Sequence, residues 1–186
     1  VSTTFSALAY NMTAMREQGV LKRMRGTPMP SGALLVGIAG HAVTNTALQI
    51  VLITTAGKLF FGVDWPPRPL ELVVFVALGV ACFASLGVAL SHVIPNSESA
   101  PAYVNAIFLP LIIISGVFYD ADHVPAFLAG IAQALPLTHL IDGLSAAMVT
   151  GDGIGGQLSE IGVLVAWAVL GTVLAVRGFS LEAQRS

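Results

Sequence analysis

The sequence has little charge. Asp, Glu, Lys and Arg together make up only 10% of its 186 residues, whereas a soluble domain carries about a quarter. Hydrophobic residues make up 55%, and the mean hydropathy is +0.84. These values argue against a water-soluble fold, and the net charge of -2 argues against a nucleic-acid partner.

Cysteine and recognisable catalytic motifs are also scarce. Cys82 is the only cysteine, which rules out an intrachain disulfide and a metal site built from cysteines. The four histidines (His41, His92, His123 and His139) are scattered, and no zinc-protease, nucleophile-elbow or phosphate-loop motif occurs. The sequence therefore predicts no catalytic residue, metal or cofactor in this chain, and any energy source must be another polypeptide or an ion gradient.

The apolar residues fall in blocks long enough to cross a bilayer. Residues 31–57 contain no Lys, Arg, Asp or Glu, and a helix of that length extends about 40 Å at 1.5 Å per residue. Further spans are predicted at 70–94, 100–118 and 160–176. Residues 1–14 have the pattern of the end of another membrane helix.

The 119–159 segment has a different pattern. Its two apolar stretches, 124–135 and 137–149, are each too short to cross as a straight helix and are separated by Pro136. Short re-entrant or interfacial helices are expected there. The predicted fold is thus all-α, a polytopic transmembrane helical bundle forming a single domain over 1–186. Because the sequence opens inside an apolar pattern, we expect a further helix upstream of it.

Lys and Arg are unevenly distributed between the predicted loops. Six of the eight lie in segments that the count of spans places on one side, whereas Lys58 and Arg68 lie on the other. Residues 119–159 carry four aspartates and no Lys or Arg. Because cytoplasmic loops of membrane proteins are enriched in Lys and Arg, the 15–30 segment and the C-terminus are expected in the cytoplasm. The 58–69 and 119–159 segments are then expected outside.

One face of the 31–57 span carries three polar side chains. His41, Asn45 and Gln49 recur at four-residue intervals. Because an unpaired polar group in hydrocarbon is costly, this face is expected to point at protein or at a watery cavity. It is either a substrate-lining surface or a set of ordinary interhelical hydrogen bonds. Asn105, in the 100–118 span, has the same two interpretations.

The 15–30 segment contains the run REQGVLKRMRGTP from Arg16 to Pro28. Its charges alternate with apolar residues, which predicts a short amphipathic helix at the cytoplasmic surface that ends at Pro28. Composition alone indicates no more than a helix lying on the membrane surface.

Two motifs resemble those of the permeases of the ABC type-2 exporter family, and the resemblance covers nearly the whole chain. That family has a cytoplasmic RE-x-G-x-L element followed by a proline, which residues 16–28 match. It also has an apolar helix running into SG-x-F, and then PLTH-x-x-D; these match FLPLIIISGVFYDADHVP at 108–125 and PLTHLIDGL at 136–144. The chain departs from the pattern at Ser145, where the family usually carries Arg or Gln.

The resemblance implies a bacterial cytoplasmic-membrane permease whose first helix of six this chain lacks. It implies a second permease subunit, with a homodimer as the first expectation, and separate ATPase subunits that bind ATP and Mg. The residues it implies in coupling to the ATPase are Arg16, Glu17, Gly19, Leu21, Lys22, Arg23, Met24 and Pro28. Those it implies in an external gate are Gly116, Phe118, Pro136, His139 and Asp142.

The predicted function is therefore outward transport of an amphipathic, drug-like or lipid-like substrate, with this chain as a transporter subunit rather than an enzyme. Two alternatives stay open. One is an intramembrane lipid-modifying enzyme that uses His139 and Asp142, whose i, i+3 spacing permits a hydrogen-bonded pair. The other is a non-catalytic membrane assembly protein.

Overall fold

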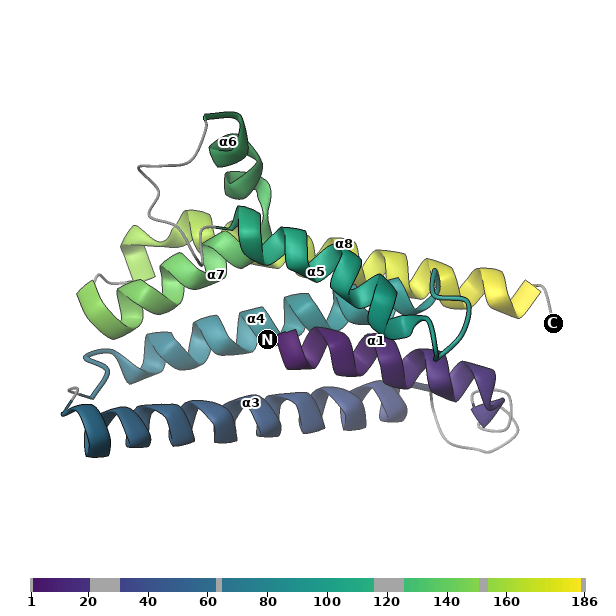
Figure 1. Cartoon of the computed structure of the whole chain (residues 1–186), viewed down its shortest axis with the longest axis horizontal. Helices are drawn as coiled ribbons and strands as arrows, with labels where there is room; N and C mark the ends of the chain where they lie inside the picture. The colour runs from purple at the N-terminus through teal and green to yellow at the C-terminus, as the bar shows by residue number, and fades with distance from the viewer. Residues whose placement is uncertain (1, 21–30, 63–64, 116–125, 151–153, 185–186) are drawn as a thin grey trace.

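The computed structural model describes residues 2–20, 31–62, 65–115, 126–150 and 154–184, and every regular element among them is helical. Five helices are long: α1 (Ser2–Glu17), α3 (Ser31–Phe61), α4 (Pro69–Ser91), α5 (Ala100–Ile114) and α8 (Leu158–Gln184). Two are short: α6 (Ala126–Ala134) and α7 (Pro136–Ser145), which continues into a π-helical turn, η2 (Ala146–Thr150). A 3-10 turn, η3 (Ile154–Gly156), precedes α8 (Figure 1). The predicted all-α class is confirmed for these residues.

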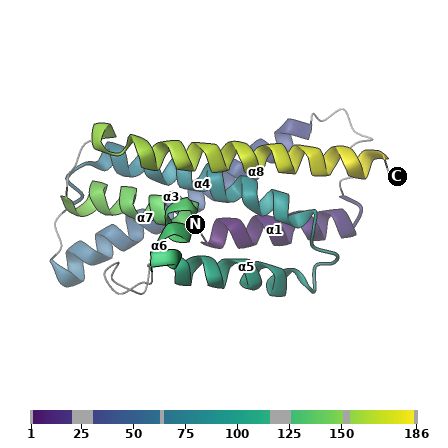
Figure 2. The same cartoon turned by 90° about the horizontal axis from the view of Figure 1, so that it is seen from above.

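Helix α4 occupies the centre of the bundle. It packs against α1, α3, α7 and α8, and its contact with α8 is the most extensive in the molecule. Figures 1 and 2 show these long helices running lengthwise, with α3 and α8 on opposite sides of α4 and α5 alongside α1. A single helix thus connects most of the others.

Several helices extend beyond the predicted spans: α1 runs to Glu17 and α8 to Gln184, past the predicted ends at 14 and 176. α3 begins at Ser31, as expected, and continues to Phe61 instead of ending at 57. α4 ends at Ser91 rather than at 94. By length and composition, α4 and the Leu158–Gly178 part of α8 could each cross a membrane, whereas α5 is apolar but shorter.

Prolines explain where three helices start. Pro69, Pro101 and Pro136 lie in the first turns of α4, α5 and α7. Proline suits this position because its missing N–H would have no partner inside the helix and its fixed φ is already helical. α5 also continues through an internal proline, Pro110.

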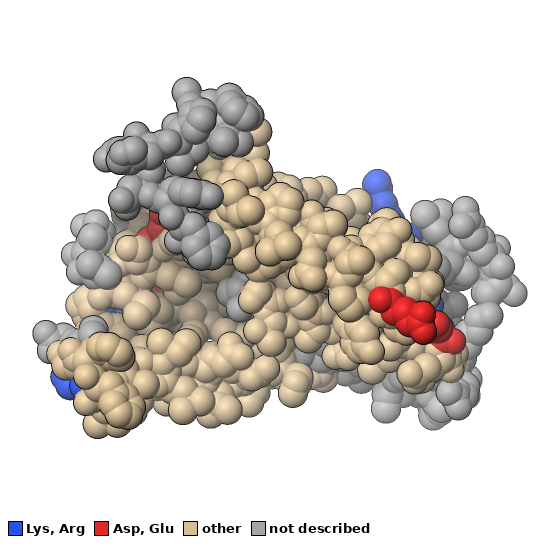
Figure 3. Space-filling model, viewed as in Figure 1, with Lys and Arg blue, Asp and Glu red and all other residues tan. Residues whose placement is uncertain are grey.

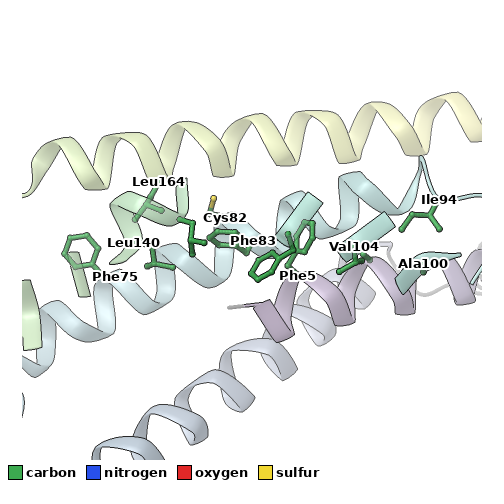
Figure 4. Close-up of a cluster of buried hydrophobic side chains, with 12 residues drawn as sticks. Phe5, Phe75, Cys82, Phe83, Ile94, Ala100, Val104, Leu140 and Leu164 are labelled. Atoms are coloured by element: carbon green, nitrogen blue, oxygen red, sulfur yellow. The ribbon is translucent and has the colours of Figure 1, made fainter. Parts of the chain in front are cut away.

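Three phenylalanines join α1, α4 and α5. The ring of Phe5 stacks on Phe108 at a centroid distance of 5.7 Å, and Phe83 meets both rings edge-on at 6.5 and 6.4 Å. Each such aromatic pair contributes about 0.5–1.5 kcal/mol beyond the burial of its area. Phe75, Leu140 and Leu164, all at most 1% exposed, extend this core to α7 and α8 (Figure 4).

Candidate functional site

Charged side chains gather toward the ends of the molecule on the face drawn in Figure 3, and the broad middle of that face is uncharged. This distribution suits helices whose central turns lie in hydrocarbon, where a charge is expensive. The described candidate coupling residues, Arg16, Glu17 and Gly19, lie at the end where α1 finishes and α5 begins.

Arg16, in the last turn of α1, binds the end of α4. Its Nη1 donates to the Ser91 carbonyl oxygen at 3.0 Å, and its Nη2 donates to the Ile94 carbonyl oxygen. The last carbonyls of a helix have no partner within the helix and carry partial negative charge. A guanidinium with several donors in one plane can therefore bind the last carbonyl of α4, that of Ser91, and at the same time the Ile94 carbonyl in the loop that follows.

Glu17 binds the same connection from the next position. Its Oε2 accepts hydrogen bonds from the Ser97 backbone N–H at 3.0 Å and the Ser97 hydroxyl at 2.5 Å. These two hydrogen bonds, with a smaller contribution from the Arg16 charge, hold the pKa of Glu17 below its ordinary value. We call Arg16, Glu17 and their partners in 91–97 the Arg16–Glu17 clasp.

The loop held by the clasp is itself ordered where α5 begins. The Asn96 side-chain oxygen accepts a hydrogen bond from the Ser99 backbone N–H at 2.8 Å, and the Ser99 hydroxyl donates to the Asn96 carbonyl at 3.0 Å. Such Asx-type contacts are typical of a chain turning into a helix. The clasp therefore joins the end of α1, the end of α4 and the start of α5.

Gly19 ends α1. Its N–H donates to the Arg16 carbonyl at 3.1 Å, and its φ of +67° lies in the left-handed region that favours glycine at a helix C-terminus. Arg16 and Glu17 therefore belong to the last turn of α1, whereas the sequence predicts a separate amphipathic helix there. The five other residues predicted to couple to the ATPase lie outside the described residues: Leu21, Lys22, Arg23, Met24 and Pro28.

The polar face predicted on α3 is only partly turned toward the bundle. Asn45 and Gln49 are half-buried, whereas His41 is exposed. α3 contacts its neighbours through Ala42 and Thr46, whose exposed fractions are 8% and 7%. Each i, i+4 step advances about 40° around a helix. The polar stripe therefore rotates toward the packed face of α3 from His41 to Gln49. The structure therefore separates His41 from the other two.

Asn105 lies in a different place. It lines a groove of about 400 Å³ between α1 and α5, together with Tyr10 and Asn11 of α1. The described part of the chain thus brings Asn105 next to α1 and not next to the α3 face. The sequence alone does not single out Tyr10 and Asn11, because residues 1–14 contain five further polar residues, all serine or threonine.

The corner between α6 and α7 is bound to α8. His139 Nε2 lies 2.7 Å from the Gln133 carbonyl, and Trp167 Nε1 donates to the Ala134 carbonyl at 2.9 Å. Pro136, buried at the start of α7, makes the turn. Three predicted gate residues, Pro136, His139 and Asp142, are therefore grouped by α7. Gly116 and Phe118 lie outside the described residues.

The hydrogen bond that the i, i+3 spacing of His139 and Asp142 permits is not formed, since His139 Nε2 contacts the Gln133 carbonyl instead. Partial burial raises the pKa of Asp142, an effect that His139 opposes and Glu160 reinforces. Among the described residues, no group of three His, Cys, Asp or Glu side chains could hold a metal ion.

Comparison with known proteins identifies the family of this chain. The sequence pattern of the ABC-2 type transporter family matches residues 1–149. Nodulation protein J of Rhizobium leguminosarum bv. viciae is 27% identical over 91% of the chain and 64% of its own length. The linearmycin resistance permease protein LnrN of Bacillus subtilis is 22% identical over 91% of the chain and 44% of its own length.

The inner membrane transport permease YadH of Escherichia coli K12 is 25% identical over 91% of the chain and 65% of its own length. The chain thus spans less than two thirds of the length of these relatives. No solved structure matches it. Because the family pattern covers most of the chain, and the fold is helical and apolar as that family requires, this all-α membrane protein belongs to the ABC-2 type transporter family.

Proposed function

We propose that this chain is the membrane-spanning part of a permease subunit in an ATP-driven exporter of a bacterial cytoplasmic membrane. A separate ATPase subunit binds the 15–30 segment from the cytoplasm, and this chain crosses the membrane several times and lines the path of an amphipathic substrate. Family membership supports the transport role, and two relatives are themselves named as permeases.

The Arg16–Glu17 clasp carries the coupling part of this proposal. Arg16 and Glu17 are the first two residues of the coupling motif, and their side chains bind the α4–α5 connection. A displacement of the 15–30 segment would therefore move α1, the end of α4 and the start of α5 together. Coupling between distant sites needs such a connected set of packed elements.

The groove between α1 and α5 is the proposed substrate path. Its walls are mostly apolar, and Asn11, Asn105 and Tyr10 add polar groups. A mixed surface of this kind suits a compound with one apolar and one polar part. α5 also exposes Tyr103, Leu109 and Ile113, so a second copy of the chain could close the path from the opposite side.

Two substitutions distinguish binding of the ATPase from transmission of its movement to the membrane helices. Leu21→Asp places a charge in the proposed apolar contact with the ATPase, so the ATPase is expected to be lost on co-purification. Ser97→Ala removes one of the two hydrogen bonds to Glu17, so the complex is expected to persist while export falls severalfold. Ser159→Ala, at the other end of the molecule, is the matched control because its hydroxyl donates a hydrogen bond to the neighbouring Glu160 and not to a distant segment of the described chain.

Intact complex and full ATP-driven export in both variants would overturn the coupling assignment. If instead no ATPase co-purifies with the unmodified protein expressed at full length, the assembly-protein alternative is favoured. Co-purification of an ATPase with the unmodified protein distinguishes the two failures: it persists if only the coupling assignment is wrong, and it is absent if the transport role itself is wrong.

A further inference from the structure

A second and larger groove lies on another side of the bundle. It has a volume of about 700 Å³ and is lined mainly by α4, α5 and α8, with Phe5 of α1 and with Leu135 and Pro136 at the corner between α6 and α7. On α4 its lining runs from Phe83 to Val93, and on α8 from Trp167 to Gly178. We call it the α5–α8 groove. Its lining shares no α5 residue with the proposed substrate path between α1 and α5.

The polar groups of this groove lie at one end. Most lining residues are aliphatic or aromatic, whereas His92 and the exposed Arg177 lie together where α4 finishes and α8 nears its C-terminus. This is also the end that carries the Arg16–Glu17 clasp, because Arg16 binds the carbonyls of Ser91 and Ile94. The distribution of Lys and Arg in the sequence predicts that this end faces the cytoplasm.

The distance from the polar end to the aromatic residues corresponds to one leaflet. Trp167 and Arg177 are separated by 177 − 167 = 10 residues of α8, which is about 15 Å of helix. Phe83 and Val93 have the same separation along α4 and its end. The hydrocarbon core of a bilayer is about 30 Å thick, so its cytoplasmic half is about 15 Å.

Close packing of α4 on α8 fixes the polar end. A Cβ atom at Gly178 would collide with the His92 ring, and a Cβ atom at Gly171 would collide with the Ser85 hydroxyl. Glycine at these two positions, one heptad apart, lets the two helices approach closely. His92 is therefore packed against α8 at Gly178, one residue from Arg177. This packing fixes the position of His92 beside Arg177.

We propose that the α5–α8 groove binds an anionic phospholipid of the cytoplasmic leaflet. Arg177 and His92 contact the phosphate, and one acyl chain follows the apolar wall as far as Phe83 and Trp167. The charge at one end matches an anionic headgroup, and the volume lies within the range of about 300–1,000 Å³ that ligand sites occupy. A soluble anion would leave the apolar length unused, and a zwitterionic lipid would gain less from the cation. This lipid is a bound partner and not the exported compound.

Tryptophan fluorescence can test this assignment without an ATPase. The chain has two tryptophans, and Trp65→Phe leaves Trp167 as the single reporter inside the groove. The protein is placed in phosphatidylcholine vesicles that contain either dibrominated phosphatidylglycerol or dibrominated phosphatidylcholine, since bromine quenches tryptophan on contact. One cation near the surface favours an anionic lipid about fivefold, so phosphatidylglycerol is expected to quench at about one fifth of the mole fraction.

Charge substitutions decide whether Arg177 causes the preference. Arg177→Gln is expected to remove the preference for phosphatidylglycerol and Arg177→Lys to retain most of it. Lys58→Gln, which removes a cation from the last turn of α3, is expected to change nothing. Equal quenching by both lipids, or an unchanged preference in Arg177→Gln, would overturn the proposal. Absence of quenching by either lipid would show that protein covers the groove, which also overturns it.

Discussion

Helices α3 and α4 are similar in sequence character and opposite in environment. Both are long and apolar. On α4, Phe75, Cys82 and Phe83 are at most 1% exposed, whereas on α3 Leu48 and Ile53 are 59% and 68% exposed. Hydrophobicity therefore predicts that a helix enters the membrane but not which helix becomes the centre of the bundle, because lipid tails are as apolar as leucine.

Close contacts distinguish the two helices. α4 meets α8 at Ser85, which lies directly against Gly171. α3 has a sparser contact, in which the hydroxyls of Thr46 and Thr4 lie 3.4 Å apart. Packing in a membrane depends on small residues that let backbones approach and on buried side chains that fill the space between them. The packed half around α4 and the exposed half of α3 should therefore respond differently to matched substitutions.

The largest expected difference concerns phenylalanine. Phe83→Ala removes a ring that is 1% exposed and contacts the rings of Phe5 and Phe108. A buried Phe→Ala change costs about 3–5 kcal/mol. Phe60→Ala on α3, where the ring is 81% exposed, is the matched control and should have little effect. Thermal unfolding of both variants in the same detergent measures the difference, and equal losses would mean that α3 is packed as tightly as α4.

Glycine gives a smaller effect whose sign differs between the two halves. Gly171→Ala would bring a methyl group into the Ser85 hydroxyl and to 3.0 Å from the Leu86 backbone nitrogen, and overpacking costs about 1–3 kcal/mol. Gly40→Ala on α3 meets open space, so it should stabilise by up to about 1 kcal/mol through helix propensity. Loss of stability in both variants, measured by the same unfolding experiment, would contradict the contrast.

Helix positions were largely predictable from the sequence because they depend on local signals. Runs without charge and prolines in first turns mark where α3, α4, α5 and α7 lie. The range predicted for α3 ends before Lys58, the first charged residue after Ser31, whereas the helix continues to Phe61 because one charged side chain near a helix end can reach the membrane surface. Propagation of a helix past a single charge costs little.

The candidate site was less predictable because it depends on contacts between distant segments. Arg16 and Glu17 were identified, but their partners at 91–97 were not, since nothing local links residues 80 apart. Spacing grouped His41 with Asn45 and Gln49, and the rotation of the stripe around α3 separates them. Nothing in the sequence links Trp167 and Arg177 to α4, because only the packing of α8 on α4 makes them part of a groove.

The smallest predicted effect is electrostatic and lies on α7, which contacts α4 and α8 but leaves the Asp142 side chain exposed. The pKa of Asp142 is raised, chiefly by partial burial, so its ionised form opposes folding at neutral pH. Asp142→Asn should therefore raise the melting temperature slightly near pH 7. The gain should shrink as pH falls through the raised pKa of Asp142, because the unmodified carboxyl then becomes neutral in the folded protein.

Glu160 provides the control for this prediction because its charge adds to the rise in the Asp142 pKa. In a Glu160→Gln background the benefit of Asp142→Asn should be smaller but still present, since burial is the larger cause. Unfolding scans between pH 4 and 8 would measure both differences. A gain that grows as pH falls would mean that the Asp142 carboxylate stabilises the packed half instead, and α7 would then be held to α4 by charge rather than by its apolar residues.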